Sequence, residues 1–153
     1  MKKILATALL FLLAVPDAWS DPHPQAEEIQ AYRDTVMDGL GKSMKATAML
    51  VKEKVDRQDD AIHHARSLHG MSVLLCGLFP EGTGPDAGIE TRALPVIWES
   101  WADYETACKK FEAESKRLVE IAESGDFESF KAQFGNVGGA CGECHDRFRA
   151  EEE

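Results

Sequence analysis

Three residues in the last part of the 153-residue chain could bind a cofactor covalently. They belong to the run Cys141-Gly142-Glu143-Cys144-His145. This Cys-x-x-Cys-His spacing is the attachment signature for c-type haem. Each thiol can add across a vinyl group of the porphyrin to form a thioether, and the adjacent imidazole can donate a nitrogen to iron. On a helix the three side chains share one face, so one planar macrocycle can meet all of them.

Three other roles are open to the same cysteines. A thioredoxin-like redox pair normally follows a strand in a βαβ unit, and the chain has no strand-like alternation. A structural zinc site needs further ligands, and no second Cys-x-x-Cys or histidine pair at ligand spacing is present. A disulfide between Cys141 and Cys144, within one helical turn, would have poor geometry. We therefore favour attachment of one haem c.

The rest of the sequence predicts four helices that must position these residues. Apolar residues recur at helical spacing over residues 25–51, 57–75, 95–122 and 127–148, as in helices with one buried face. The four stripes are Ile29, Tyr32, Val36, Leu40, Met44 and Val51; Ala61, Ala65, Leu68, Ser72 and Leu75; Ile97, Trp101, Tyr104, Cys108, Phe111, Ser115, Leu118 and Ala122; and Phe127, Phe130, Phe134, Val137, Cys141, Cys144 and Phe148. The pattern predicts an all-α protein, an antiparallel up-down-up-down four-helix bundle that encloses the covalently bound haem.

Turn signals separate these helices. Asp56 is expected to cap the second helix, and Ser124-Gly125-Asp126 to end the third and cap the fourth. Residues 77–93 are rich in helix breakers, namely Pro80, Gly82, Gly84, Pro85 and Gly88. They predict a long connection, and a loop of this length inside a compact domain usually has a structural or functional use.

The first 20 residues predict an export signal. A basic start at Lys2 and Lys3 precedes an uncharged apolar run over residues 4–15, and small residues follow near position 20. The run is shorter than the roughly 20 residues that span a bilayer. We expect residues 1–20 to be a signal peptide and residues 21–153 to be a haem domain in the periplasm, with no membrane span.

The charge of the chain bears on its partners. Loss of Lys2, Lys3 and Asp17 with the signal takes the net charge from −10 to −11. Such a charge argues against binding to nucleic acid or to anionic lipid. It fits periplasmic redox proteins that have basic docking patches.

Several segments carry a family resemblance. The motif is preceded by Phe134-Gly135-Asn136-Val137-Gly138 and followed by Phe148-Arg149. Further segments are Tyr32-Arg33 with Met37, Leu78-Phe79-Pro80-Glu81-Gly82-Thr83, and Pro95-Val96-Ile97-Trp98. Together they resemble the distal segment, central loop, third helix and attachment site of the class II c-type cytochromes, the cytochrome c′ family. The likeness covers nearly all of residues 21–153.

The resemblance implies roles for particular residues. It implies a haem between the four helices, with iron bound by His145 on the proximal side and Arg149 near that histidine. It also implies that Arg33 lies near a haem propionate. Bundles of that family often pair through their first two helices, so both a monomer and a homodimer are open. From the residues alone, Arg33 and Arg149 could also be solvated surface arginines.

Met37 decides between two functions. It lies one helical turn after Arg33, so both can face the same side of the haem. In the family that the chain resembles, some members use a methionine here as sixth ligand and carry electrons, while others keep five-coordinate iron and bind small gases. A thioether ligand favours reduced iron, and Met44, two turns further on, is a competing candidate.

We expect a monohaem electron carrier with His145 and Met37 as iron ligands. The alternatives are a five-coordinate haem protein that binds nitric oxide or carbon monoxide, and a haem-free helical interaction protein. The sequence supplies no general base beside a substrate pocket, so we do not expect an enzyme.

Several other residues are candidates for a functional or structural role. Cys76 and Cys108 could form a disulfide in an oxidising compartment. However, Cys108 lies about 20 Å along the third helix from Pro95, so the two are expected at different levels, as buried free thiols. The histidines of the second helix lack the i, i+4 spacing of a helical metal site; they are His63, His64 and His69. The residues expected in the core, some of them in the wall of the haem pocket, are Met44, Met49, Trp98, Trp101, Phe111, Phe127, Phe130 and Phe134.

Overall fold

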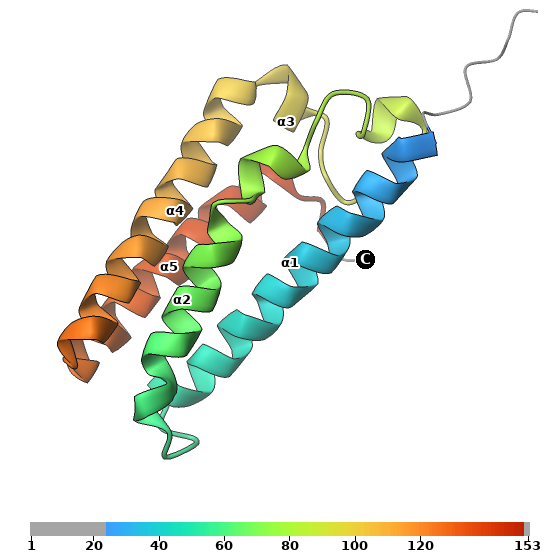
Figure 1. The fold of residues 1–153 in the computed structure, drawn as a ribbon. Coiled ribbons are helices and arrows are strands. Elements are labelled where there is room, and N and C mark those ends of the chain that lie inside the picture. The colour runs from blue at the N-terminus through green and yellow to red at the C-terminus, as the bar shows by residue number, and fades with distance from the viewer. Residues whose placement is uncertain (1–23, 152–153) are drawn as a thin grey trace, which may run out of the picture.

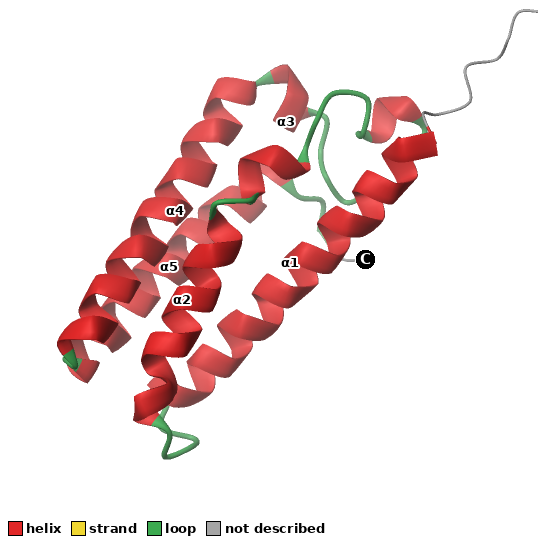
Figure 2. Ribbon diagram, in the orientation of Figure 1, coloured by secondary structure: helices red, strands yellow, loops and turns green. Residues whose placement is uncertain are grey.

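The computed structural model describes residues 24–151, which form four main helices and one short helix (Figure 1). The main helices are α1 (Pro24–Val51), α2 (Ala61–Ser72), α4 (Trp101–Ser124) and α5 (Phe127–Phe148), and the short one is α3 (Val96–Glu99). Single 3-10 turns lie in the connections: η1 (Gln58–Asp60), η2 (Leu75–Leu78) and η3 (Pro85–Ala87). Figure 2 shows that loops only join and flank these helices. Within this part of the chain, extended pairing is limited to an isolated bridge between Ala93 and Arg149.

The main helices form the antiparallel up-down-up-down bundle that the sequence predicts (Figure 1). Short turns join α1 to α2 and α4 to α5, and the long connection over residues 77–93 leads from the α2 side to the α4 side. α4 packs along both α5 and α2, and α2 packs along α1, whereas α1 and α5 make few contacts with each other. The bundle is therefore closed on three sides by helix packing and opened on the fourth.

The stripes predicted for the last two main helices are largely confirmed as core. Tyr104, Cys108 and Leu118 are buried on α4, and Phe130 and Val137 are buried on α5. Trp101 is an exception, because 40% of it is exposed. These residues pack with the α2 side chains Ala61, Ala65 and Leu68. Burial of such side chains contributes about 25 cal/mol per Å² of apolar surface removed from water.

The buried face of α1 differs from the predicted stripe. Tyr32 is 55% exposed, whereas the neighbouring Arg33 is only 2% exposed and Thr47 is fully buried. Met49, expected in the core, is 41% exposed. The pattern of apolar residues predicts the wrong buried face for this part of α1, because Arg33, a charged residue, occupies a core position.

The ends of the helices confirm one predicted cap and contradict another. Gly125 has a left-handed φ of 76° at the end of α4, and the Asp126 side chain accepts a hydrogen bond from the Ser129 N–H at the start of α5. Asp56, in contrast, does not cap α2, because η1 intervenes and α2 begins at Ala61. The predicted second helix over residues 57–75 is therefore too long at both ends.

The predicted third helix is broken in two at Ser100, whose φ of −127° and ψ of 51° are not helical. The break lets α3 turn toward the long connection. The Trp98 indole donates to the carbonyls of Phe79 and Pro80 at 3.1 and 3.0 Å. A Cβ atom at Gly84 would lie 2.7 Å from the Trp98 ring, so this close approach requires glycine.

The predicted signal over residues 1–20 lies outside the described residues. Between residues 24 and 151, none of the helices has the length and apolar character needed to cross a membrane.

Candidate functional site

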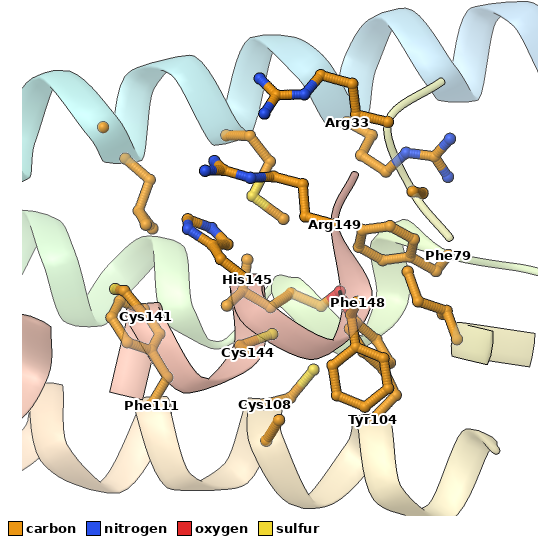
Figure 3. Close-up of a pocket in the computed structure, with 18 of the residues that line it drawn as sticks. Arg33, Phe79, Tyr104, Cys108, Phe111, Cys141, Cys144, His145, Phe148 and Arg149 are labelled. Carbon is orange, nitrogen blue, oxygen red and sulfur yellow. Dashed lines mark hydrogen bonds between the residues drawn. The ribbon is translucent and has the colours of Figure 1, made fainter. Parts of the chain in front are cut away.

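A cavity of about 430 Å³ lies between α1, α4 and α5, on the side of the bundle where α1 and α5 separate. Residues from all three helices and from the segment 91–93 line it. Figure 3 shows its aromatic side chains together with the cysteines and histidine of α5. A largely apolar cavity with a few polar groups is typical of a cofactor site.

Cys141, Cys144 and His145 all line this cavity, as their spacing predicts. The three side chains are half-buried and project from one side of α5 (Figure 3). Burial raises the pKa of each thiol to about 11, with a smaller contribution from Cys144 at Cys141 and from Cys76 at Cys144. At neutral pH both sulfurs are therefore protonated thiols that face an apolar space, and neither is in a disulfide.

His145 is held in its neutral form. Burial lowers the pKa of its imidazole, and the nearby positive charges of Arg149 and Arg92 lower it further. A neutral imidazole keeps a nitrogen lone pair for a metal ion. Arg149 also lines the cavity and lies beside His145 (Figure 3), although its side chain is exposed.

Arg92 is a site residue that sequence reasoning missed. It lines the cavity and reaches His145 electrostatically. The Ala93–Arg149 bridge brings it there, with the Ala150 N–H donating to the Arg92 carbonyl at 2.8 Å and the Leu94 N–H to the Phe148 carbonyl at 3.0 Å. No local pattern could have revealed this, because the pairing joins segments more than 50 residues apart in sequence.

Arg33 is a buried cation at the edge of the cavity rather than a surface arginine. Its guanidinium donates to the Thr83 carbonyl at 3.0 Å and to the Leu78 carbonyl at 3.3 Å, and it lies 4.6 Å from the centre of the Phe79 ring. It also donates to the Gln30 side chain. Burial lowers the pKa of Arg33, although Asp34 partly opposes this.

The environment of Arg33 suits an anion. Its hydrogen-bond partners within residues 24–151 are neutral carbonyl, amide and hydroxyl oxygens, and no carboxylate forms an ion pair with it there. A buried charge is normally paired. The position is therefore chemically suited to a carboxylate brought in by a ligand.

Met37 and Met44 line the cavity from α1, with Gly41 between them. Both methionines are half-buried. α1 thus presents two thioether sulfurs to the space that His145 enters from α5. The two methionines are the thioether side chains that line this cavity among the described residues.

The aromatic wall is only partly the predicted one. Of the aromatic residues expected in the core, Phe111 lines the cavity. Phe79, Tyr104 and Phe148 line it as well. The Tyr104 ring centre lies 4.9 Å from that of Phe79 and 5.3 Å from that of Phe148, in edge-to-face contact. The sequence placed Tyr104 and Phe148 on buried stripes without indicating that they face a cavity.

The remaining candidates divide into two cases. His69 lies on α2 with its Nδ1 3.3 Å from the Ser115 hydroxyl, inside a small network between α2 and α4. Within residues 24–151, no group of three His, Cys, Asp or Glu side chains could hold a metal ion. Cys76 and Cys108 are free thiols as expected, Cys108 buried and Cys76 half-buried. The predicted difference in level is wrong, because η2 packs against α4 and the Tyr104 hydroxyl donates to the Leu75 carbonyl at 3.3 Å.

The sequence of the chain is similar to those of known proteins of one family. The family described as "Cytochrome C'" matches residues 28–149. Cytochrome c′ from Rhodospirillum rubrum is 30% identical over 152 residues, which cover 99% of this chain and 100% of that protein. Cytochrome c-554 from Cereibacter sphaeroides is 27% identical over 154 residues, with 99% and 100% covered.

Solved structures agree in fold. Crystalline cytochrome c′ from Rubrivivax gelatinosus has a TM-score of 0.74 at 29% identity and covers 81% of this chain and 96% of that chain. The nitric oxide complex of a variant of cytochrome c prime from Alcaligenes xylosoxidans has a TM-score of 0.76 at 24% identity and covers 83% and 97%.

The residues of the cavity fit a covalently bound haem. Two protonated thiols and a neutral imidazole on one face of α5 open onto an apolar space, and a buried arginine at its edge is suited to a carboxylate. With the match over residues 28–149, this chain belongs to the cytochrome c′ family, whose members carry covalently bound haem c.

Proposed function

We propose that the protein is a monohaem electron carrier of the periplasm in which His145 and Met37 would both bind the iron. The observation that supports this proposal is that Met37 on α1 and His145 on α5 line one cavity together with both motif cysteines. Bound haem c would supply reversible one-electron chemistry at its iron. The protein would hold it between two helices and exclude bulk water with an apolar wall.

In this proposal each residue has a defined task. Cys141 and Cys144 would hold the group through two thioether bonds, since each thiol can add across a vinyl group, with sulfur on one carbon and its proton on the other. The His145 nitrogen is the proximal ligand, kept unprotonated by burial and by the charges of Arg149 and Arg92. The Arg33 guanidinium would pair with a propionate, and its hydrogen bonds to the long connection would hold it in place.

The carrier function also fits the rest of the chain. An iron that keeps one ligand from α1 and one from α5 in both oxidation states changes its surroundings little when it gains or loses an electron. We infer that the predicted signal exports the chain and that its net negative charge favours redox partners with basic patches. We propose a carrier or binder rather than an enzyme, working as a homodimer through the α1 and α2 faces.

A second candidate is binding of a small gas at a sixth position left open by Met37. Gly41 on α1 favours it, because it lines the cavity between Met37 and Met44 and a Cβ there would meet no protein atom within 4 Å. This leaves room near α1 for a diatomic ligand. The nitric oxide complex of the Alcaligenes xylosoxidans protein supports the same chemistry by likeness of fold.

The spectrum of the reduced protein with and without carbon monoxide tests the choice. For a carrier we expect low-spin bands that carbon monoxide does not change. Met37→Ala should become high-spin and bind carbon monoxide, whereas Met44→Ala, the matched change on the same helix, should keep the wild-type spectrum. A wild-type Soret band that shifts with carbon monoxide, or an unaltered spin state in Met37→Ala, would favour the gas binder.

A pyridine haemochrome measurement on the exported protein tests the premise common to both candidates. The band typical of thioether-linked haem is expected. Its absence would leave a haem-free helical interaction protein.

A further inference from the structure

Two cysteines outside the attachment motif lie side by side against the wall of the cavity. Cys108 on α4 is 4% exposed, and Cys76 in η2 is half-buried. Both are free thiols that pack in the same apolar cluster, and they lie close enough for Cys76 to raise the pKa of Cys108. Neither is needed to attach haem.

The fold holds these two sulfurs together through Tyr104. Tyr104 lies one turn before Cys108 on α4, and its hydroxyl donates at 3.3 Å to the carbonyl of Leu75, the residue before Cys76. The same hydroxyl lies close enough to the Cys108 thiol for each group to shift the pKa of the other. One buried side chain therefore fixes η2 and α4 at the point where the two thiols meet.

A third thiol belongs to this cluster. Cys144 interacts electrostatically with both Cys76 and Cys108, and Figure 3 shows Cys108 beside Cys144. Attachment of haem requires a reduced Cys144. In an oxidising compartment, a free thiol next to it competes by forming the wrong disulfide.

We propose that Cys76 and Cys108 form a disulfide with each other after export, and that this bond keeps both sulfurs from reacting with Cys144 while haem is attached. The proposal rests on the export and haem attachment inferred above. It assigns a modification to two residues outside the attachment motif, of which Cys108 also lines the cavity.

The oxidant is a protein disulfide available for thiol exchange. The Cys76 sulfur attacks one sulfur of that disulfide and forms a mixed disulfide, and the Cys108 sulfur then attacks Cys76 and releases the oxidant. Two S–H bonds and the oxidant's S–S bond break, and one S–S bond forms. The two electrons and two protons end on the oxidant, which leaves as a dithiol.

Cys76 is the better first nucleophile of the pair. It is partly accessible, whereas Cys108 is buried and burial raises its thiol pKa. A thiol that stays protonated attacks slowly. Once Cys76 is in the mixed disulfide, contact between the two side chains raises the local concentration of Cys108 enough to complete the exchange.

The product would tie down the long connection. A bond between residues 76 and 108 closes a ring that contains Phe79 and Thr83, which are partners of Arg33. Cross-links that close long loops restrict the unfolded chain the most. The disulfide would therefore also hold the residues that bury Arg33.

Counting free thiols in the matured, haem-loaded protein tests the proposal directly. The protein is unfolded without reductant, alkylated with iodoacetamide and weighed intact. Haem absorbance is measured on the same sample, so failed export or attachment is seen separately. Since Cys141 and Cys144 are then thioethers, we expect no alkyl group before reduction and two after it. Two alkyl groups without reduction would overturn the proposal.

Serine variants test the protective role. Cys76→Ser and Cys108→Ser each leave one unpaired thiol near Cys144, so we expect a lower haem yield and a fraction of chains with a disulfide to Cys144. The double variant Cys76→Ser/Cys108→Ser removes both competitors and should recover the wild-type haem yield. Single variants that acquire haem as fully as the double variant would disprove protection of Cys144.

Discussion

The two sides of the haem cavity are built differently. On one side α4 and α5 pack closely and are joined by polar pairs, among them Gln133 with Glu114 and Lys110 with Glu143. On the other side, α1 packs on α2 and is fastened to the long connection through Arg33. Among the described residues, the polar link between the α1 and α5 parts of the chain is an ion pair from Lys131 on α5 to Glu53, two residues beyond the end of α1.

This difference shows what the haem contributes to the fold. The α4–α5 side can pack without a cofactor, because its apolar faces already meet. The face of α1 that carries Met37 and Met44 borders the cavity instead. A group bound between α1 and α5 supplies the packing that these helices lack, and its removal should weaken α1 first.

The largest predicted effect follows from removing the attachment site with Cys141→Ala/Cys144→Ala. Without covalent haem, we expect a loosely folded chain in which the cavity-facing amides of α1 lose hydrogen-exchange protection. Protection in α4 around Leu118 should persist longer, since it is fully buried against protein. Hydrogen exchange with mass spectrometry compares the two helices in one sample. Equal loss of protection in α1 and α4 would contradict this comparison.

Substitution of Arg33 should have the second largest effect. Arg33→Leu removes the donor to the Leu78 and Thr83 carbonyls and leaves them buried without a partner, which should cost about 2–4 kcal/mol of unfolding free energy. Denaturant unfolding measures the loss. Arg117→Leu, an exposed arginine on α4, is the matched control and should change stability by less than about 0.5 kcal/mol. A similar loss in both variants would argue against a special role for the buried charge.

Alanine substitutions at two neighbouring glycines of α5 should have smaller effects, one stabilising the protein and the other disturbing the haem. Gly138 lines the cavity, whereas Gly139 is exposed and does not. Alanine in place of a helical glycine adds about 1 kcal/mol of helix stability, so Gly139→Ala should stabilise the haem-loaded protein. Gly138→Ala should instead reduce haem content or shift the Soret band, because its methyl group enters space needed by the haem. Identical behaviour of the two variants would show that the haem does not approach α5 at Gly138.

The smallest effect concerns the cap of α5 and depends on pH. Hydrogen bonds from the Ser129 side chain and N–H hold the pKa of Asp126 below its usual value. The stability from this lowered pKa is present above the unfolded value of about 3.9 and is lost as the pH falls through the folded value. Asp126→Ala should therefore lower the melting temperature at neutral pH, with the deficit shrinking in acid, whereas Asp126→Asn keeps a cap. A deficit that does not change with pH would exclude the ionised cap.

Sequence reasoning predicted the four helices, the cap at Asp126 and the shared face of Cys141, Cys144 and His145, because all of these depend on residues within one or two turns. It failed where distant segments decide the outcome. Arg33 is buried because residues 78–83 fold over it, and Arg92 reaches the site through a bridge to Arg149. Likewise, the contact of Cys76 with Cys108 depends on η2, which a helical period cannot predict.

The break at Ser100 has a consequence for spectroscopy. Trp98 and Trp101 flank this break, and they are the tryptophans of the described part of the chain. The Trp98 indole is bound to the Phe79 carbonyl, and Phe79 lines the haem cavity. Intrinsic fluorescence at this corner therefore reports on the local opening of the cavity wall. Far-ultraviolet circular dichroism averages over the helices, so a difference between the two melting curves would separate loosening of that wall from collapse of the bundle.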